Sequence, residues 1–427
     1  MSQRIPFKPY RPLAIRLFNA VGRVLAVFGI KASLKPESII KAARRRAGLQ
    51  EFGNTDFMPA LEVLANALDT EAKLHPFGRL VARDRLVGFL TVRLKVQQLT
   101  RDHPEILQQQ IKAPLVIAGL QRTGTTMLHR LLAADPDNRA MMSWESIDPT
   151  PPAVKPGKPD PRYKKAQLAE KALKYMAPEF FAIHPVEAGA PEEDILLLEY
   201  SLMSDVPESM FYVPSYGEWL KQQDMTPAYD YLKLLLQLLQ WQDAPKNERG
   251  RWVLKTPAHL GQLDTLLKVF PDARIIQTHR DPSRTTASFS SMVTHGTGVF
   301  SDQVDAHERA MLWLNKNADM LRSARRVREQ QPEAFIDVSY YDLMQDPLGE
   351  VQRIYAFAGI ELTAASRTAM EASRKANKKD RHGKHRYSLE AFGLTPEIVD
   401  EKYADYRKTY GIPPENTSTV DHNKVAA

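Results

Sequence analysis

The chain has 427 residues, of which 43% are hydrophobic, so it can bury a full core as one enlarged α/β domain or as two or three domains. Its formal net charge of +7 favours anionic ligands or anionic surfaces without identifying either. The absence of cysteine excludes disulfides, thiolate nucleophiles and cysteine metal sites, and it is typical of a reducing compartment, here expected to be the cytoplasm.

The first apolar stretch, LAIRLFNAVGRVLAVFGI at residues 13–30, is interrupted by Arg16 and Arg23. Charges within so short a run disfavour a membrane-spanning helix, and the N-terminus lacks the pattern of a signal peptide. The segment is expected to be an amphipathic helix. It either packs on the core or makes a peripheral membrane contact.

Residues 1–112 are expected to form a helical N-terminal extension, because apolar residues recur there at intervals of three and four. The basic run ARRRA at 43–47 is typical of a solvated helix face. A nucleic-acid contact is the less favoured interpretation because no aromatic residues interleave with the arginines, and no nucleic-acid partner is expected.

Four short apolar runs have the character of buried strands: PLVIAG at 114–119, RWVLK at 251–255, ARIIQTH at 273–279 and AFIDVS at 334–339. Helical patterns separate them, which predicts a parallel sheet with helices on both faces. Ligands of such sheets bind at the carboxyl ends of the strands, so the residues that follow each run are the ones to inspect.

The first strand is followed by GLQRTGTT at 119–126, which has the glycine spacing of a phosphate-binding P-loop but Thr125 in place of its lysine. Backbone N–H groups of such a loop can surround an anion, and Thr123, Thr125 and Thr126 add hydroxyl donors. ATP hydrolysis is disfavoured without the lysine, although Arg122 supplies a cation. A plain strand-to-helix turn with capping threonines is the alternative.

The third strand is followed by RDPSRTTASFSSM, which places Arg280 at the strand end and Ser288 two turns into the next helix. An arginine and a helix-borne hydroxyl suit a second, separate phosphate. A local ion pair between Arg280 and Asp281 is the alternative.

Together these motifs resemble the sulfotransferase family, in its bacterial-type branch with an R-[ST]-G-T-T loop. The similarity extends over residues 114–147 and 250–410. The resemblance implies a P-loop-like fold and 3′-phosphoadenosine 5′-phosphosulfate (PAPS) as co-substrate, with no metal. It assigns the phosphosulfate to the loop, the 3′-phosphate to Arg280 and Ser288, and the vicinity of the adenine to Tyr341. The loop residues are Arg122, Thr123, Gly124, Thr125 and Thr126. A basic segment at 381–395 matches a loop that covers the nucleotide in the family.

Within the resemblance, Arg122 stabilises the leaving phosphate and Lys255 contacts the transferred group. Glu145 in MMSWESIDP is the favoured base for the acceptor hydroxyl, with His259 and His184 as rivals. A helix-capping role is the alternative for Glu145. The histidine of the K-T-H pattern found in related enzymes is displaced by two residues here, to His259.

The fold class predicted is therefore α/β, with a P-loop-like parallel sheet of about five strands flanked by helices. Its domains are the extension at 1–112 and an α/β domain at 113–427, with a helical acceptor-site insertion at about 150–248. The function implied is sulfuryl transfer to a hydroxyl of a small, apolar or lipid-like acceptor. The alternatives are an ATP-dependent small-molecule kinase and a non-catalytic nucleotide-binding protein. Six aromatic residues are expected either to line the acceptor pocket or to belong to the core: Phe180, Phe181, Phe211, Tyr212, Tyr216 and Trp219.

Overall fold

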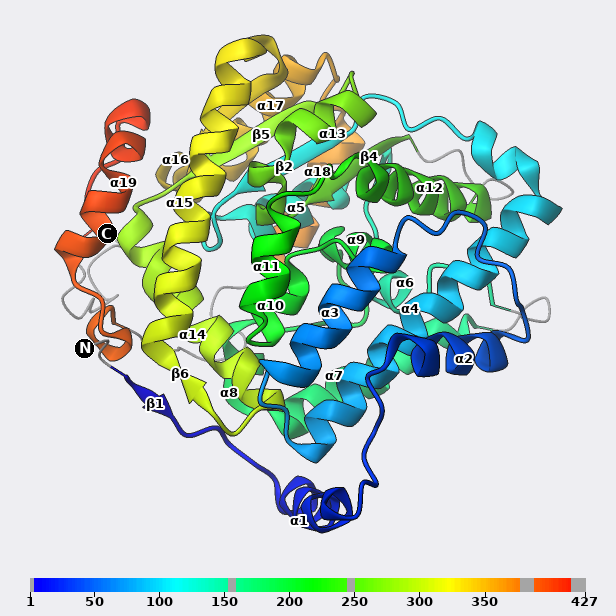
Figure 1. The fold of residues 1–427 in the computed structure, drawn as a ribbon. Helices are drawn as coiled ribbons and strands as arrows, with labels where there is room; N and C mark the ends of the chain where they lie inside the picture. Colours follow the sequence, from blue (N-terminus) through cyan, green and yellow to red (C-terminus); the bar gives the residue numbers. More distant parts are fainter. Residues whose placement is uncertain (1–3, 153–158, 244–249, 377–387, 416–427) are drawn as a thin grey trace.

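The predicted strands form one parallel sheet in the computed structural model, which describes residues 4–152, 159–243, 250–376 and 388–415. The strand order is β3-β4-β2-β5-β7, with β2 at the centre (Figure 1). The α/β fold with about five parallel strands is thereby confirmed. The strands are β2 (Leu115–Gly119), β3 (Asn138–Arg139), β4 (Arg251–Lys255), β5 (Arg274–His279) and β7 (Phe335–Ser339).

Successive residues of β2 pack into two different hydrophobic clusters, because side chains alternate between the faces of a strand. Leu115 and Ile117 belong to a cluster with α5 and α17, whereas Val116 and Ala118 belong to a larger one with α12, α13 and α15. Both faces of the sheet are therefore covered, which explains why the strand is a continuous apolar run. These helices are α5 (Thr125–Ala133), α12 (Thr226–Asp243), α13 (Leu263–Val269), α15 (Ala306–Gln330) and α17 (Pro347–Ala358).

The register of the sheet brings three strand ends together. Ile117 pairs with Lys255 of β4, and Gly119 pairs with Thr278 of β5. A Cβ on Gly119 would lie 1.9 Å from Thr278 Oγ1, so only glycine fits where the chain leaves β2. The segments that follow β2, β4 and β5 consequently start from the same edge of the sheet.

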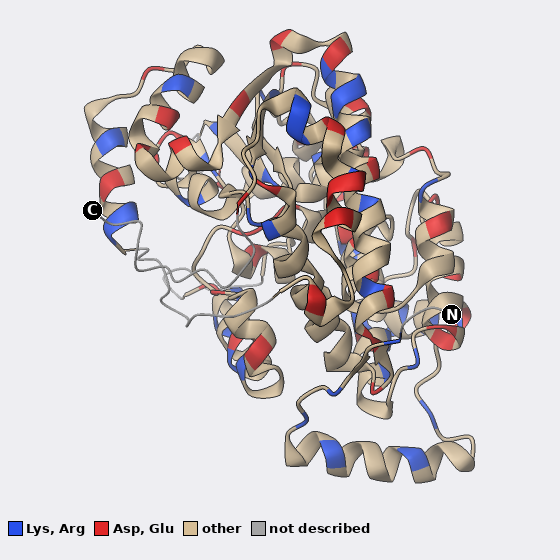
Figure 2. Ribbon diagram, turned by 90° about the vertical axis from the view of Figure 1, so that its left-hand side faces the viewer, with Lys and Arg blue, Asp and Glu red and all other residues tan. Residues whose placement is uncertain are grey.

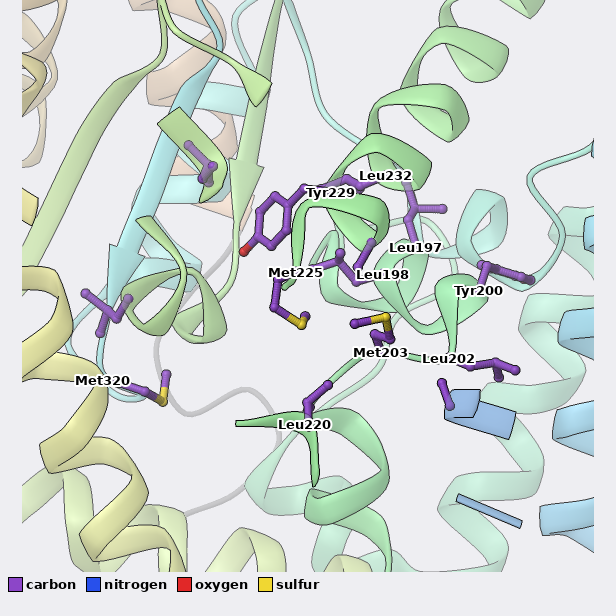
Figure 3. Close-up of a cluster of buried hydrophobic side chains, with 14 of the residues drawn as sticks. Leu197, Leu198, Tyr200, Leu202, Met203, Leu220, Met225, Tyr229, Leu232 and Met320 are labelled. Carbon is purple, nitrogen blue, oxygen red and sulfur yellow. The ribbon is translucent and has the colours of Figure 1, made fainter. Parts of the chain in front are cut away.

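The N-terminal helices share the larger hydrophobic cluster with the sheet, since Leu61, Leu64 and Leu90 belong to the same cluster as Val116. Residues 161–243 are mostly helical and add to it. Figure 3 shows part of this cluster, where Tyr229 and Leu232 of α12 lie beside Leu197 and Leu198 of α9. The helices of these two regions are α2 (Pro36–Ala47), α3 (Met58–Thr70), α4 (Pro76–Asp102), α6 (Ser143–Ile147), α7 (Pro161–Met176), α8 (Pro178–Ile183), α9 (Ile195–Leu198), α10 (Val206–Met210) and α11 (Pro214–Leu220).

The first segment of the described chain is tied to a distant one by a small antiparallel sheet. Strand β1 (Pro6–Phe7) pairs with β6 (Val304–Asp305), and α1 (Leu13–Val27) follows at the edge of the molecule (Figure 1). No helix within the described ranges is both long and apolar enough to cross a bilayer. The remaining helices are α14 (Pro282–Phe300), α16 (Tyr340–Gln345), α18 (Ala364–Ala376) and α19 (Pro396–Tyr410), and short 3₁₀ turns lie at 104–108, 199–201, 257–261, 332–334 and 390–392.

Candidate active site

The loop between β2 and α5 is a tight turn with two left-handed residues. Arg122 has φ 69° and Gly124 has φ 89°. A side chain is disfavoured in this conformation, and a Cβ on Gly124 would also approach Leu343 Cδ2 to 3.0 Å. The turn directs the first N–H groups of α5 toward the carboxyl end of β2, which is the geometry of an anion site.

The threonines of this loop have different environments. Thr123 is fully buried, and its Oγ1 donates to the carbonyl of Leu120 and lies 2.6 Å from Thr278 Oγ1. It fastens the loop to β5 and does not face a ligand. Thr125 and Thr126 line the cavity described below, as do Arg122 and Gly124. The structure therefore places four of the five predicted loop residues at the cavity and gives the fifth a structural role.

Arg280 leaves the end of β5 and reaches the same loop. Its Nη1 donates to the carbonyl of Arg122 at 3.1 Å, and its guanidinium lies 3.8 Å from the ring centroid of Tyr340. Ser288 lies on the first turns of α14, is buried, and lines the same cavity. The two predicted anion sites thus lie side by side although their arginines are separated by 158 positions in the chain.

A carboxylate occupies the second anion site. Glu415 accepts hydrogen bonds from Arg280 Nε at 2.8 Å and from Nη2 at 3.0 Å, and it also lies 3.5 Å from Arg284. Tyr341 donates its hydroxyl to the same carboxylate at 3.0 Å. Burial acts to raise the pKa of Glu415, but the hydrogen bonds and charge of Arg280 outweigh it and lower the pKa. This site therefore holds an anion in the structure described here.

Tyr341 faces Glu415, whereas its neighbour Tyr340 packs on the loop and lines the cavity. Burial, reinforced by the charge of Glu415, raises the pKa of Tyr341, so its hydroxyl is a donor at neutral pH. The basic segment at 381–395 is expected to cover the nucleotide. Its residues 381–387 lie outside the described residues, and within 388–395 the side chains of Leu389 and Phe392 are buried.

Glu145 does not face the cavity. Both of its carboxylate oxygens are held by Arg139, at 2.7 and 2.5 Å, and one also accepts the N–H of Met142 at 2.8 Å. Arg139 also pairs with Asp243 at 2.8 Å and lies over the ring of Trp252. This geometry gives Glu145 the capping role at the start of α6 that the sequence left open, and it offers no oxygen to an acceptor hydroxyl.

Lys255 and His259 are also buried away from the cavity, but each contacts the acidic segment that follows α8. Lys255 Nζ donates to Glu193 at 2.6 Å, and its backbone N–H donates to Asp194 at 2.7 Å. His259 Nε2 lies 2.8 Å from Asp194 Oδ2, and its Nδ1 lies 2.8 Å from the hydroxyl of Tyr229. His259 is thereby fixed inside the core, whereas Glu193 lines the cavity.

The cavity has a volume of about 1380 Å³ and joins the two anion sites to a largely apolar chamber. Of the six aromatic residues singled out in the sequence, Phe180 lines it; Phe181, Phe211 and Tyr216 are core residues, and Tyr212 and Trp219 are not part of its wall. The apolar wall consists mainly of Phe89 and Val92 of α4, Leu173 and Met176 of α7, Phe180 and Ile183 of α8, Met210 of α10, Phe289, Met292, Val299 and Phe300 of α14, and Trp313 of α15.

Of the three candidate bases, His184 alone lines the cavity. Sequence reasoning missed Tyr340, Glu193 and Glu415. Tyr340 directly precedes the singled-out Tyr341, and Glu193 lies in the acidic run PEED, so both had a local signal. Glu415 had none, because its role depends on a contact with a residue 135 positions away.

A glycine loop after the central strand, an arginine after the next strand and an apolar chamber beside both are the features of a P-loop-like α/β protein. The chain belongs to the sulfotransferase family, whose sequence profile matches residues 114–364. Among solved structures it is similar to sulfotransferase STF1 of Mycobacterium tuberculosis H37Rv, with 34% identity and a TM-score of 0.77 over 88% of this chain and 100% of that one. It is also similar to sulfotransferase STF9 of Mycobacterium avium, with 30% identity and a TM-score of 0.80 over 89% and 98% of the two chains.

Two curated relatives match more distantly. They are the proteins named omega-hydroxy-beta-dihydromenaquinone-9 sulfotransferase Stf3 of Mycobacterium tuberculosis (strain CDC 1551 / Oshkosh) and of Mycobacterium bovis (strain ATCC BAA-935 / AF2122/97). Each is 23% identical over 261 residues, which is 58% of this chain. The match spans 63% of the length of these relatives.

Proposed function

We propose that this sulfotransferase moves a sulfuryl group from PAPS to the hydroxyl of a lipid-like acceptor. One observation carries the proposal: two anion sites, at the ends of adjacent strands, open on one large and mainly apolar cavity. A PAPS molecule has two phosphate-bearing ends, and the apolar chamber supplies room for an acceptor beside them.

The donor would be held by residues from both strand ends. The N–H groups at the start of α5, with Arg122, Thr125 and Thr126, suit the 5′-phosphosulfate. Arg280 and Ser288 suit the 3′-phosphate. Because Glu415 already binds Arg280 in bidentate fashion, the 3′-phosphate would have to displace this carboxylate.

In the proposed reaction the acceptor oxygen attacks sulfur as the bond from sulfur to the 5′-phosphate oxygen breaks. Negative charge develops on that leaving oxygen, and Arg122 is placed to stabilise it. Lys255 belongs to the strand next to β2 and holds Glu193 at the cavity wall.

We assign the base role to Glu193 and give Lys255 the role of positioning it. A carboxylate at the cavity wall can accept the proton that the acceptor hydroxyl loses. His184 also lines the cavity, but its ring packs against Phe180 of α8, whereas Glu193 is held by Lys255 at the end of β4. Glu193→Gln should reduce turnover at least about 100-fold while nucleotide affinity stays unchanged. Full activity of Glu193→Gln with loss in His184→Gln would transfer the role to the histidine.

The lipid-like acceptor is supported by the size and lining of the chamber. At about 1380 Å³ the cavity exceeds the roughly 300–1,000 Å³ common for small-molecule sites. The curated relatives are named as sulfotransferases of omega-hydroxy-beta-dihydromenaquinone-9, a hydroxylated menaquinone. A long-chain alcohol of this general type is the acceptor that we propose.

The kinase alternative is weakened by the environment of Asp281, the acid placed best to hold a magnesium ion. Its side chain is fully buried, accepts the N–H groups of Ser283 and Glu415, and pairs with Arg407. A non-catalytic nucleotide-binding protein would need the anion sites alone. A large apolar chamber open to both anion sites favours a second substrate.

Gly88 offers a direct test of the acceptor site. It lies on α4 in the cavity wall, and a Cβ at this position meets no atom within 4 Å. Gly88→Phe should fill part of the chamber and raise the KM for a long-chain alcohol at least about tenfold. Gly88→Ala is the matched control, and both variants should bind 3′-phosphoadenosine 5′-phosphate (PAP) like the parent. An unchanged KM in Gly88→Phe would remove the chamber as the acceptor site.

A further inference from the structure

We propose that α1 docks this protein on an anionic lipid surface, with its apolar outer face inserted among the lipids. This proposal depends on the proposed function only where it takes the acceptor to be a lipid drawn from that surface. The docking itself is independent of catalysis.

Helix α1 buries little of its apolar side-chain surface against the body of the protein. Asn19 is its one buried residue, and its Oδ1 accepts the N–H of Phe77 at 2.9 Å. Gly22 packs closely against Pro76, where an added Cβ would approach to 2.5 Å. The face directed toward the body is therefore narrow, with Asn19, Gly22 and the half-buried Ile15 along it and Phe18 packed edge-on against Phe77 beside it.

The outer face of α1 is apolar and exposed. Leu13, Leu17, Val21, Val24 and Phe28 recur at intervals of four, four, three and four residues, which places them on one side of a helix. Leu25, Val27 and Ile30 are also exposed. So many large apolar side chains in one short segment exceed what scattered surface residues explain, and they indicate an interaction surface.

The charge of the same region identifies the partner. No Asp or Glu precedes Glu37, whereas seven basic residues do. Figure 2 shows α1 carrying only basic bands and set apart from the body between two chain segments. Cationic side chains beside an exposed apolar helix face are the combination that binds anionic bilayers. The basic residues are Arg4, Lys8, Arg11, Arg16, Arg23, Lys31 and Lys35.

A second copy of the chain is a less suitable partner for this face. A two-fold contact would bring two segments of the same charge together with no acid from either to compensate. Arg11 and Arg23 already use Asp302 of the same molecule, 3.2 and 2.8 Å away. An anionic surface satisfies the remaining cations without this repulsion.

The helix also lies beside elements that form the cavity wall. Through Asn19, α1 is fixed to the N-terminus of α4, which contributes Phe89 and Val92 to the chamber. Through Asp302, it is fixed just beyond the C-terminus of α14, which contributes Val299 and Phe300. Docking through α1 would hold this end of the cavity wall close to the lipid.

The test is flotation of the full chain with vesicles of equal parts phosphatidylcholine and phosphatidylglycerol, compared with phosphatidylcholine alone. The parent protein should bind the anionic vesicles at least about tenfold more strongly than the neutral ones. Leu17→Ser should weaken binding about threefold, and the triple change of Leu17, Val21 and Val24 to serine at least about tenfold. Leu107→Ser is the matched control, since Leu107 is 56% exposed and Leu17 is 60% exposed.

Equal binding of the parent and the triple variant would overturn the proposal. So would a parent that is dimeric without lipid and becomes monomeric in the triple variant by sedimentation velocity, because α1 would then be an interface between copies. PAP affinity measured on the same samples separates the docking proposal from the proposed function. A parent protein that binds PAP but not the anionic vesicles refutes the docking alone. Absent PAP binding with intact vesicle binding refutes the proposed function.

Discussion

Glu415 gives the most informative single substitution, because its carboxylate stands where the 3′-phosphate of the donor is expected. Glu415→Gln keeps the shape and one acceptor oxygen but removes the charge that pairs with Arg280. The side chains of Arg280 and Glu415 are 14% and 22% exposed, so solvent screens the pair only in part. In the proposed function, the nucleotide would have to break this pair before its 3′-phosphate could bind.

The magnitude follows from the geometry. Two charge-assisted hydrogen bonds at 2.8 and 3.0 Å, discounted for partial exposure, are worth about 1.4 kcal/mol relative to the neutral amide. Relief of this competition should lower the dissociation constant of PAP about tenfold. ADP lacks the 3′-phosphate and does not compete for Arg280, so its affinity should change less than about twofold.

Isothermal titration calorimetry of PAP and ADP would measure both effects. Glu401→Gln makes the same change of charge at an exposed position of α19 and serves as the control. An unchanged or weakened PAP affinity in Glu415→Gln would refute the competition and leave Glu415 as a structural partner of Arg280. A parallel gain for ADP would show that the effect is not specific to the 3′-phosphate.

Three further predictions concern other residues. Arg122→Ala should lower turnover at least about 1,000-fold at constant stability, and near-normal turnover would remove its role at the leaving phosphate. Glu145→Gln should cost about 3 kcal/mol of stability in urea unfolding because Arg139 stays buried, with near-parental turnover in the folded protein; the reverse pattern would restore the base role to Glu145. His75 caps α4 through Nδ1, and burial together with Arg11 lowers its pKa to about 4. The unfolded chain, with a histidine pKa near 6.5, then binds the extra proton, so stability should fall by about 1.4 kcal/mol per pH unit as the pH drops from about 6.5 to about 4. His75→Asn preserves a capping oxygen and should remove that slope, and an equal slope in both proteins would contradict the assignment.

The central sheet could be predicted because its signals are local. Strands β2, β4, β5 and β7 are apolar runs covered on both faces, and they differ from the predicted ranges by at most one residue. Strand β3 and the β1–β6 pair could not be predicted, because a two-residue strand has no periodicity. Their pairing depends on partners far along the chain.

The residues of the proposed anion sites could be located for the same reason, since glycine spacing and strand ends are local features, and their binding of anions stays a prediction. The acid–base residues could not be predicted from local features. Glu145 is held by Arg139, and Arg139 is held in turn by Asp243, which lies 104 positions further along the chain. Glu193 reaches the site through Lys255, which lies 62 positions away. Residue type alone did not distinguish a carboxylate facing the cavity from one buried in an ion pair.

The aromatic residues illustrate a second limit. Tyr216 and Phe211 have the size of pocket-lining residues, yet they are buried in the core, where the hydroxyl of Tyr216 binds the carbonyls of Leu202 and Ser204. The chamber is instead built from helices that are remote from one another in sequence, including α4 and α14. The aromatic composition of residues 180–219 therefore could not define the wall of the chamber.

The most direct measurement is a thermal-shift comparison of PAP with ADP and Mg-ATP. A ligand at a hundred times its dissociation constant adds about 2.7 kcal/mol to stability, which is readily detected. We expect stabilisation by PAP well above that by ADP, and loss of this preference in Arg280→Ala. Equal stabilisation by PAP and ADP, or a preference for Mg-ATP, would contradict this expectation.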